Sequence, residues 1–226
     1  REAARRLVAA RQPGLFLGWG SLGARAELIE LAELLGAPAC TTLQGLSAFP
    51  ANHPLHTGMG FGAYAVPAAE NAFAGCDCLL AVGTRFSEIP TGSYSMPVPA
   101  QLIHVDINPA VFGANFPARL SIEGDAAQVV PALLREVRAL LPAPRSSALP
   151  ARIARDKADY LQQWLRHDSR GRVNPARFCQ ELRRQMADDA IVVADDGNHT
   201  FLLAELLPIH AARGFISPSD FNAMGY

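Results

Sequence analysis

Residues 14–36 read GLFLGWGSLGARAELIELAELLG, which joins an apolar run, a glycine-rich turn and a helical pattern. Residues 14–18 are typical of a short buried strand. Over residues 24–35 apolar side chains recur at helical spacing, and a glycine then ends the pattern. A strand that passes through a glycine turn into a helix is the opening step of a parallel sheet covered by helices. This stretch therefore predicts an α/β fold.

The alternation continues along the chain, after a helical pattern at residues 4–8. Further strands are expected at 38–42, 78–83, 101–106 and 119–123, and helices at 67–73 and 126–141. Long loops are expected at 41–62 and 85–100. We predict a doubly wound, Rossmann-like parallel sheet over residues 1–141, the central domain.

Residues 142–150 read PAPRSSALP, whose prolines and serines have no periodicity and indicate a linker. Residues 142–173 are interpreted as this linker and a connecting helix at about 151–167. Asn174-Pro175 is a typical helix start, and Phe178, Leu182 and Met186 are expected to face inward. Strands at 190–194 and 214–217 flank a turn at 195–198 and a helix at 199–207. Residues 174–226 thus form an incomplete second α/β unit.

The chain has 226 residues, 50% hydrophobic and 18% charged, and a formal net charge of -1. This composition excludes a disordered chain and gives no electrostatic reason to expect nucleic acid or a membrane surface as partner. No apolar run reaches the ~20 residues that span a bilayer. Its four unevenly spaced cysteines favour a reducing compartment, and we expect a soluble, cytoplasmic protein. Neither Cys76 with Cys78 nor His53 with His56 has further ligands in place, so no metal site is predicted.

Residues 18–23, Gly-Trp-Gly-Ser-Leu-Gly, fit the G-x-G-x-x-G pattern between a strand and a helix. Glycines there let the backbone approach a pyrophosphate at the helix N-terminus. However, the second strand ends in Thr41-Thr-Leu-Gln-Gly45, without the carboxylate that holds a ribose hydroxyl. This counts against an NAD dehydrogenase. A turn that serves only close strand-to-helix packing stays open as the alternative.

Other candidate residues follow predicted strands. The loops at 41–62 and 83–95 and the segment that begins at Asp106 leave carboxyl ends of strands, where ligands bind in open α/β sheets. Asp106 is either a ligand residue or a cap of the next turn. The amides of Gly197 and Asn198 beside His199 suit a phosphate, or form a plain turn. Lys157, the only lysine, is predicted to lie on the polar side of its helix without a pocket.

The order of segments resembles the thiamine-diphosphate-dependent enzymes of the acetolactate synthase and pyruvate oxidase type. The residues that carry the resemblance over the central domain are Gly18-Trp-Gly20, Pro38 to Gly45, His53 to Gly60, Gly83-Thr-Arg-Phe86, His104 to Pro109 and Gly124-Asp125. Residues 174–226 are similar to the start of the domain that binds the cofactor's diphosphate. Its first loop would be Val193 to His199, and Asn222 to Gly225 would begin the segment that holds the aminopyrimidine.

The resemblance implies thiamine diphosphate and Mg²⁺ as cofactors of the whole enzyme. It places Gly197, Asn198 and His199 beside the diphosphate, and Asn222, Ala223 and Met224 under the pyrimidine and thiazolium. Some members of the family hold FAD across the central domain, while others leave this fold empty or bind another nucleotide. The residues matching the FAD loops are Gly18, Gly20, Thr42, Gly45, Gly58, Gly60, Gly83, Thr84, Arg85, Asp106 and Ile107. After Phe86 the chain lacks the charged run that flavin-binding synthases tend to have.

The resemblance further implies an enzyme that decarboxylates pyruvate and joins it to a second 2-keto acid, as a homodimer or homotetramer. In this family the activating glutamate precedes the central domain, and the magnesium motif G-D-G…N follows the last segment matched here. The chain begins at Arg1 without methionine and ends at Tyr226, so we expect a fragment that is inactive alone and carries no catalytic or metal-binding residue. Two alternatives remain: a noncatalytic FAD- or NAD-binding module, and a subunit-packing module that uses the apolar loop at 61–66.

Overall fold

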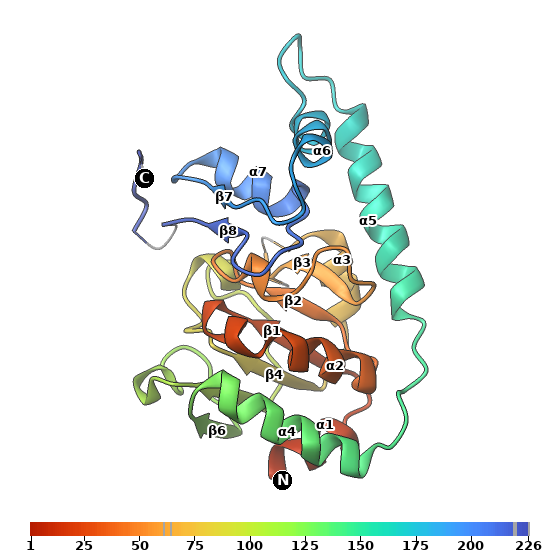
Figure 1. Ribbon diagram of the computed structural model, residues 1–226, viewed down its shortest axis with the longest axis vertical. Helices are drawn as coiled ribbons and strands as arrows, with labels where there is room; N and C mark the ends of the chain where they lie inside the picture. Colours follow the sequence, from red (N-terminus) through yellow and green to blue (C-terminus); the bar gives the residue numbers. More distant parts are fainter. Residues whose placement is uncertain (61, 64, 219–220, 226) are drawn as a thin grey trace.

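The computed structural model describes residues 1–226 except 61, 64, 219–220 and 226. The described residues form a six-stranded parallel sheet with helices on both faces, and a smaller unit stacked beside it (Figure 1). The strand order is β3-β2-β1-β4-β5-β6, so the direction of the winding reverses between β1 and β4. This is the doubly wound Rossmann order. The predicted fold class is confirmed.

The elements of the large sheet alternate as expected. Its strands are β1 (Pro13–Leu17), β2 (Ala39–Thr41), β3 (His56–Met59), β4 (Cys78–Val82), β5 (Leu102–Asp106) and β6 (Leu120–Glu123). The helices that cover it are α1 (Glu2–Ala9), α2 (Arg25–Leu35), α3 (Pro67–Phe73), α4 (Ala126–Leu140) and α5 (Leu149–Arg166). Each of the three central strands is buried along its whole length, as a sheet covered on both faces requires.

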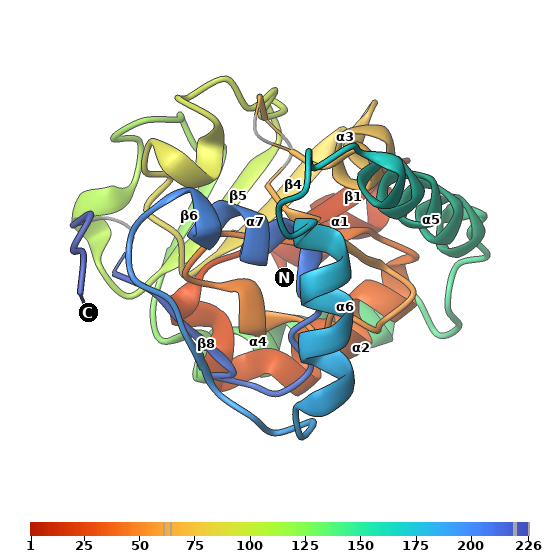
Figure 2. The same ribbon diagram turned by 90° about the horizontal axis from the view of Figure 1, so that it is seen from above.

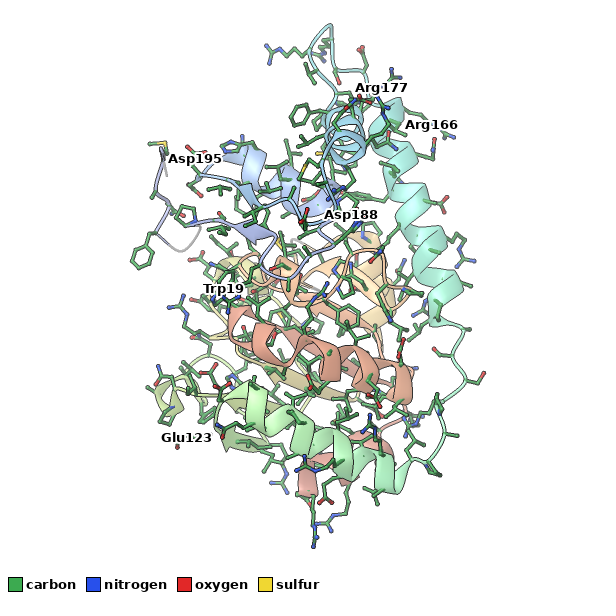
Figure 3. The ribbon with its side chains drawn as sticks, in the orientation of Figure 1. Trp19, Glu123, Arg166, Arg177, Asp188 and Asp195 are labelled. Atoms are coloured by element: carbon green, nitrogen blue, oxygen red, sulfur yellow. The ribbon has the colours of Figure 1, made fainter. Side chains whose placement is uncertain are left out.

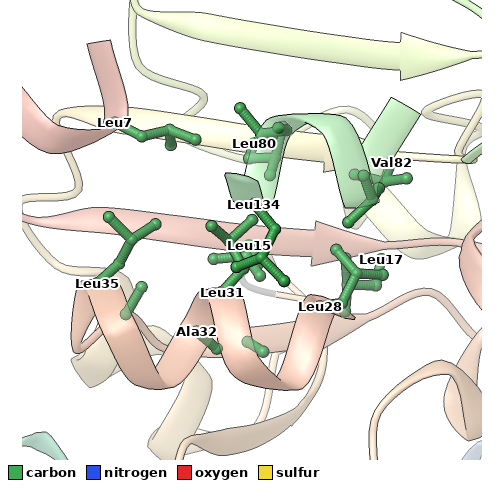
Figure 4. Packing of buried hydrophobic residues seen from close by; sticks show 14 of the residues in the cluster. Leu7, Leu15, Leu17, Leu28, Leu31, Ala32, Leu35, Leu80, Val82 and Leu134 are labelled. Atoms are coloured by element: carbon green, nitrogen blue, oxygen red, sulfur yellow. The ribbon is translucent and has the colours of Figure 1, made fainter. Parts of the chain in front are cut away.

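Alternate residues of each central strand enter different cores. Leu15 and Leu17 of β1 point toward α1, α2 and α4, together with Leu80 and Val82 of β4. Figure 4 shows these side chains interlocked with leucines of the neighbouring helices. Phe16, between the two leucines, instead packs on the face that α3 and α5 cover. The period of two along a strand therefore builds two cores, and the helices fix the sheet from both sides.

The second unit follows α5 and consists of α6 (Pro175–Gln185), β7 (Val192–Val193), α7 (Asn198–Leu206) and β8 (Phe215–Ile216). Strands β7 and β8 pair in parallel. A third core joins this unit to the large sheet, since Phe215 and Ile209 pack in one cluster with Leu43 and Met59. The backbone adds a link, because the Ala51 amide donates to the Ile209 carbonyl at 3.0 Å. Seen from above, α7 and β8 lie over the large sheet (Figure 2).

Most expected elements are present, but the predictions of a loop over residues 41–62 and of an inward-facing Phe178 are wrong. The segment expected to be a loop at 41–62 contains strand β3, which lies at the sheet edge and meets β2 through a register shift between Ala39 and Cys40. Its histidine and glycine hide the strand from a pattern based on apolar residues. Phe178 does not face inward and is 51% exposed, because α6 turns Cys179 to the core instead. The predicted helix start at Asn174 is confirmed, since its side chain accepts from the Ala176 amide at 3.0 Å.

Candidate functional site

A cavity of about 560 Å³ opens where the strand order reverses, at the carboxyl ends of β1 and β4. We call it the switch-point cavity. It is lined by Gly18, Trp19, Gly20, Thr42, Gln44, Gly83, Thr84, Arg85, Ser87, Pro90, Asp106, Ile216, Ser217, Pro218 and Phe221. Open α/β sheets bind ligands at this position, and pockets for small molecules have volumes of ~300–1,000 Å³.

Two glycine loops cross at the floor of this cavity. A Cβ atom at Gly18 would lie 2.0 Å from the carbonyl oxygen of Gly83, and one at Gly20 would lie 2.9 Å from the Gly83 Cα. Gly83 itself has a φ of +60°. A Cβ atom at Gly83 would lie 2.4–2.5 Å from backbone atoms of Gly20 and Ser21. The glycines are therefore required for packing of loop on loop. The same absence of side chains leaves the loop backbone beside the cavity.

Hydrogen bonds hold these loops in place. The Gly18 amide donates to the Val82 carbonyl at 2.9 Å, and the Ser21 hydroxyl donates to the Gly18 carbonyl at 2.7 Å. On the next loop, His104 Nε2 donates to the Thr84 carbonyl at 2.8 Å. Burial is the main cause that lowers the pKa of His104 below its ordinary value, so the ring is a neutral support of the loop.

Polar side chains reach the cavity from three strand ends. After β2, Thr42 accepts the Gly45 amide at 2.9 Å, so this side chain already holds its own turn. After β5, the buried Asp106 carboxylate accepts the Asn108 amide at 2.9 Å. This is the turn-capping contact that the sequence indicated as one role of Asp106. The same residue also lines the switch-point cavity. Arg85, which follows β4, adds a guanidinium to the lining.

The structure brings together most of the residues matched to the FAD loops. Those that line the cavity are Gly18, Gly20, Thr42, Gly83, Thr84, Arg85 and Asp106. Gly45 lies behind Thr42, against the end of β1. Gly58 lines a different cavity, Gly60 packs near the Pro90 carbonyl, and Ile107 is 69% exposed.

The sequence did not predict one wall of the cavity, which comes from the second unit. This wall consists of Ile216 at the end of β8 and of Ser217, Pro218 and Phe221 after it. Their only sequence signal is a short apolar strand, and nothing in it indicates that this strand lies over the first loop. Trp19, between the two predicted glycines, is another lining residue and is 45% exposed. Figure 3 shows Trp19 and Asp195 on the same side of the molecule.

The two segments matched to the thiamine cofactor lie side by side. His199 Nε2 is 2.7 Å from Asp195 Oδ1, and the Gly225 amide donates to Asp195 Oδ2 at 2.8 Å. The Asp196 amide also donates to the Ala223 carbonyl at 3.1 Å. The Gly225 hydrogen bond first, and the His199 contact second, hold the pKa of the Asp195 carboxyl below its ordinary value. The Asp195 carboxylate thus contacts both segments and holds them together. The sequence did not predict this role.

The residues expected to contact the thiamine cofactor are accessible to solvent near Asp195. Asn198 and His199 are exposed at the N-terminus of α7, and Gly197 at the N-cap has no side chain to occupy the first amides. Asn222 is exposed and has a φ of +49°, while Met224 is 84% exposed. The start of α7 therefore presents backbone donors and an imidazole to solvent on the side where residues 222–225 lie.

The prediction for Lys157 is wrong. Its side chain lines a cavity of about 180 Å³ between α5, β3 and the segment that ends α7. The ammonium nitrogen lies 3.4 Å from the Ala51 carbonyl oxygen and 3.4 Å from His56 Nδ1. The helical pattern of α5 placed Lys157 on the polar side, but the second unit covers that side near the middle of the helix. Burial lowers the pKa of Lys157 to about 8.

Two features are absent from the described part of the chain. Its residues include no group of three or more His, Cys, Asp or Glu side chains that could hold a metal ion. Among the same residues, no helix is long and apolar enough to cross a membrane. Phe61, at the start of the loop considered for subunit packing, lies outside the described residues.

Comparisons with known proteins agree with the fold and the order of motifs. The family model described as "Thiamine pyrophosphate enzyme, central domain" matches residues 1–133. The chain is 31% identical to the "Probable acetolactate synthase large subunit" of Methanocaldococcus jannaschii, with 100% of the chain and 39% of that relative covered. It is 34% identical to the "Acetolactate synthase" of Mycobacterium bovis, covering 100% of the chain and 37% of the relative. For "Acetolactate synthase isozyme 3 large subunit" of Escherichia coli the identity is 30%, with 100% and 40% covered. The chain thus spans about two fifths of the length of these relatives.

Proposed function

The chain belongs to the thiamine pyrophosphate enzyme family, and from this premise we propose that it works in an acetolactate synthase-like enzyme. The proposed substrates are 2-keto acids, with pyruvate as donor. Within that enzyme, residues 1–141 form the central domain, residues 142–173 the linker and connecting helix, and residues 174–226 the first part of the diphosphate-binding domain. The observation that carries the proposal is the alignment of the whole chain with acetolactate synthases across the central sheet and the second unit.

The start of α7 fits a diphosphate. The first amides of a helix point along its axis and carry partial positive charge, which favours a phosphate group. Gly197 leaves these amides uncovered, and a Cβ there would lie 2.8 Å from the His199 ring. Thiamine diphosphate supplies the electron sink that 2-keto acid decarboxylation requires. In the proposal, Gly197, Asn198 and His199 bind the diphosphate, while Asp195 holds the imidazole and keeps Gly225 beside it.

Residues 222–224 have a positioning role in the proposal. Asp195 and Asp196 tie the backbone of residues 223–225 to the start of α7. Asn222, Ala223 and Met224 would contact the rings of the cofactor from that position. Mg²⁺ is proposed as the companion of the diphosphate in the whole enzyme, and we assign no magnesium ligand to the described residues.

The switch-point cavity supports a second candidate function, which is the binding of FAD or a related nucleotide in the central domain. The strand order and the cavity at the point of reversal favour it. No carboxylate follows β2, but Asp106 at the end of β5 lies in the wall and can accept from a ribose hydroxyl. Bound flavin absorbance that persists through purification would support this binding. A colourless protein that takes up no FAD would contradict it.

The activity is tested on the native polypeptide that carries this sequence, after its intact mass and terminal sequences have been measured. Acetolactate formation from pyruvate should require both thiamine diphosphate and Mg²⁺. Absence of pyruvate consumption under these conditions would refute the proposed function. The mass of the native assembly in solution tests the proposed homodimer or homotetramer.

The 226-residue chain provides a second test. We expect it to bind thiamine diphosphate weakly and to be inactive, because the cofactor is proposed to lie between domains of two subunits. Titration calorimetry in the presence of Mg²⁺ measures this affinity. A micromolar dissociation constant would contradict the proposed division of the site.

A further inference from the structure

The cavity that contains Lys157 lies apart from the switch-point cavity and shares no lining residue with it. Its volume is about 180 Å³. Most of its wall is hydrocarbon, from Leu46, Val66, Leu161, Leu206, Leu207 and Ile209. At ~30 Å³ for each water in the liquid, this space corresponds to about six non-hydrogen atoms. The cavity is therefore small, apolar and able to hold one small organic molecule.

A lysine in such a wall needs a counterion. Lys157 makes no ion pair with any carboxylate of the described residues. Its two polar contacts are long, at 3.4 Å to the Ala51 carbonyl and 3.4 Å to His56 Nδ1. A half-buried ammonium without a counterion is unfavourable, and the lowered pKa of about 8 reflects its partial removal from water.

The neighbouring titratable groups do not supply the missing charge. On β3, burial holds the pKa of His56 well below its ordinary value, with Lys157 and His53 adding to the effect, so the imidazole is neutral. Glu205 of α7 and Tyr160 of α5 also line the cavity, and the Glu205 carboxylate accepts the Tyr160 hydroxyl at 2.6 Å. Glu205 is thus engaged by Tyr160 and forms no ion pair with Lys157.

His56 also lines the cavity. Its Nδ1 lies 3.4 Å from the Lys157 ammonium nitrogen, and the Ala51 backbone is a further hydrogen-bond partner of the ring. The Nε2 atom of His56 is buried and has no hydrogen-bond partner among the described residues. Phe49 stacks on the ring with a centroid distance of 6.3 Å and fixes its orientation. The cavity therefore holds one ammonium that makes no ion pair, beside a neutral imidazole whose buried Nε2 is closed to a ligand.

We propose that this cavity is a binding site for a small aliphatic carboxylate of three to five carbon atoms. The carboxylate would pair with the Lys157 ammonium and the hydrocarbon part would lie among the leucines. A single cation in a mostly apolar wall, with the Glu205 carboxylate held by Tyr160, matches a monoanion with a short chain better than a phosphate dianion, which requires several charged donors. The proposal is independent of the function proposed above, because neither Lys157 nor the leucines are assigned to the thiamine cofactor or to FAD. Of the residues matched to the FAD loops, Gly58 lies in the wall of this cavity.

Lys157 is the only lysine, so its titration can be observed directly. Reductive ¹³C-methylation of the 226-residue chain labels only Lys157 and the α-amino group, and NMR follows both. We expect the Lys157 signal to titrate near pH 8, and butyrate to shift it saturably and raise its pKa by about one unit or more. By linkage, butyrate affinity should then fall about tenfold over the pH range in which the free amine loses its proton. The α-amino signal serves as the internal control.

Three comparisons make the test specific. Butanol, which has the chain without the charge, should leave the pKa of Lys157 unchanged, and acetate should bind about tenfold more weakly than butyrate. Lys157→Met keeps the length of the side chain and should weaken butyrate binding, measured by calorimetry, at least tenfold. Leu161→Phe fills the cavity and should abolish the butyrate shift while the lysine signal remains, which separates loss of the site from loss of the fold.

The proposal is overturned if butyrate leaves the Lys157 signal unchanged at concentrations of tens of millimolar. It is also overturned if inorganic phosphate produces the same pKa rise as butyrate, since the apolar wall would then play no part. A Lys157 pKa near 10 without ligand would show that the side chain is not buried, and would remove the basis of the inference.

Discussion

Gly18→Ala is the sharpest test of the crossing loops under the switch-point cavity. Gly18 has a φ of −97° and a ψ of −176°, which alanine adopts without strain. The new Cβ would nevertheless lie 2.0 Å from the Gly83 carbonyl oxygen, where ordinary contacts begin at 3.4 Å. The loops must therefore separate by about 1.4 Å (3.4 − 2.0), and both partners are backbone that cannot rotate away. Overpacking of this kind costs ~1–3 kcal/mol, and we expect the upper end, about 3 kcal/mol.

For a chain of this size, about 3 kcal/mol corresponds to a fall in Tm of roughly 6–12 °C. The assay is thermal and urea unfolding followed by circular dichroism. Gly113→Ala is the matched control for backbone strain, because Gly113 has a φ of +72° and no atom within 4 Å of its hypothetical Cβ. It should cost only the left-handed strain of about 1–2 kcal/mol.

Gly83→Ala combines both effects. Its φ is +60° and its Cβ would lie 2.4 Å from the Gly20 carbonyl carbon. We expect the losses of stability to rank Gly83→Ala above Gly18→Ala, and Gly18→Ala above Gly113→Ala. If Gly18→Ala stays within about 0.5 kcal/mol of the unmodified chain, the crossing is not tight and the packing explanation of the motif fails.

Three further outcomes are expected. Asn174→Ala removes the side chain that accepts from the Ala176 and Arg177 amides. The free energy of unfolding, measured in urea, should fall by about 1–2 kcal/mol. An unchanged free energy would show that water replaces the cap. The folded-state pKa of Lys157, about 8, lies below its ordinary value of 10.5, so the unfolded chain binds more protons between these values. The wild-type chain should therefore gain stability relative to Lys157→Met as the pH rises from about 8 to 10.5, and equal pH profiles in urea titrations would contradict this sign. Asp106→Asn keeps an acceptor for the Asn108 amide but removes the charge, so the Tm should stay nearly unchanged. FAD binding, measured by fluorescence titration, should weaken about tenfold. Unchanged FAD affinity would argue against a ribose hydroxyl at Asp106.

The sequence could predict features that depend on local patterns. Apolar runs of four or five residues bounded by glycine gave the central strands, because strands buried on both faces are continuously apolar. The start of α6 was predictable because Asn174 and Pro175 are the residue types that a helix start requires. Strand β3 was missed, since His56, Thr57 and Gly58 have no apolar pattern and pair only with β2 at the edge.

The two cavities were harder to predict because each is closed by contacts between distant segments. Lys157 lies on the polar stripe of α5, and the packing of residues 46–58, 66–68 and 204–209 against that stripe turns it into a cavity wall. Ile216 and Ser217 of the second unit likewise line the switch-point cavity opposite the loops that follow β1 and β4. Helical periodicity shows which face of a helix packs on its immediate neighbours. It cannot show which other face a later segment of the chain will bury.

The glycine motif illustrates why a local pattern can leave function undecided. Gly18, Gly20 and Gly83 are each required by the contact between two loops, so their presence is explained whether or not a ligand binds. A ligand site is favoured instead by what surrounds them: the reversal of strand order, the cavity, and the buried Asp106 carboxylate on the far side of the reversal. The missing acidic residue after β2 argues against the arrangement of NAD dehydrogenases but not against a nucleotide held from β5. The glycines therefore tell little about which nucleotide this fold binds. The position of the carboxylate that accepts from the ribose, after β2 or at the end of β5, tells more.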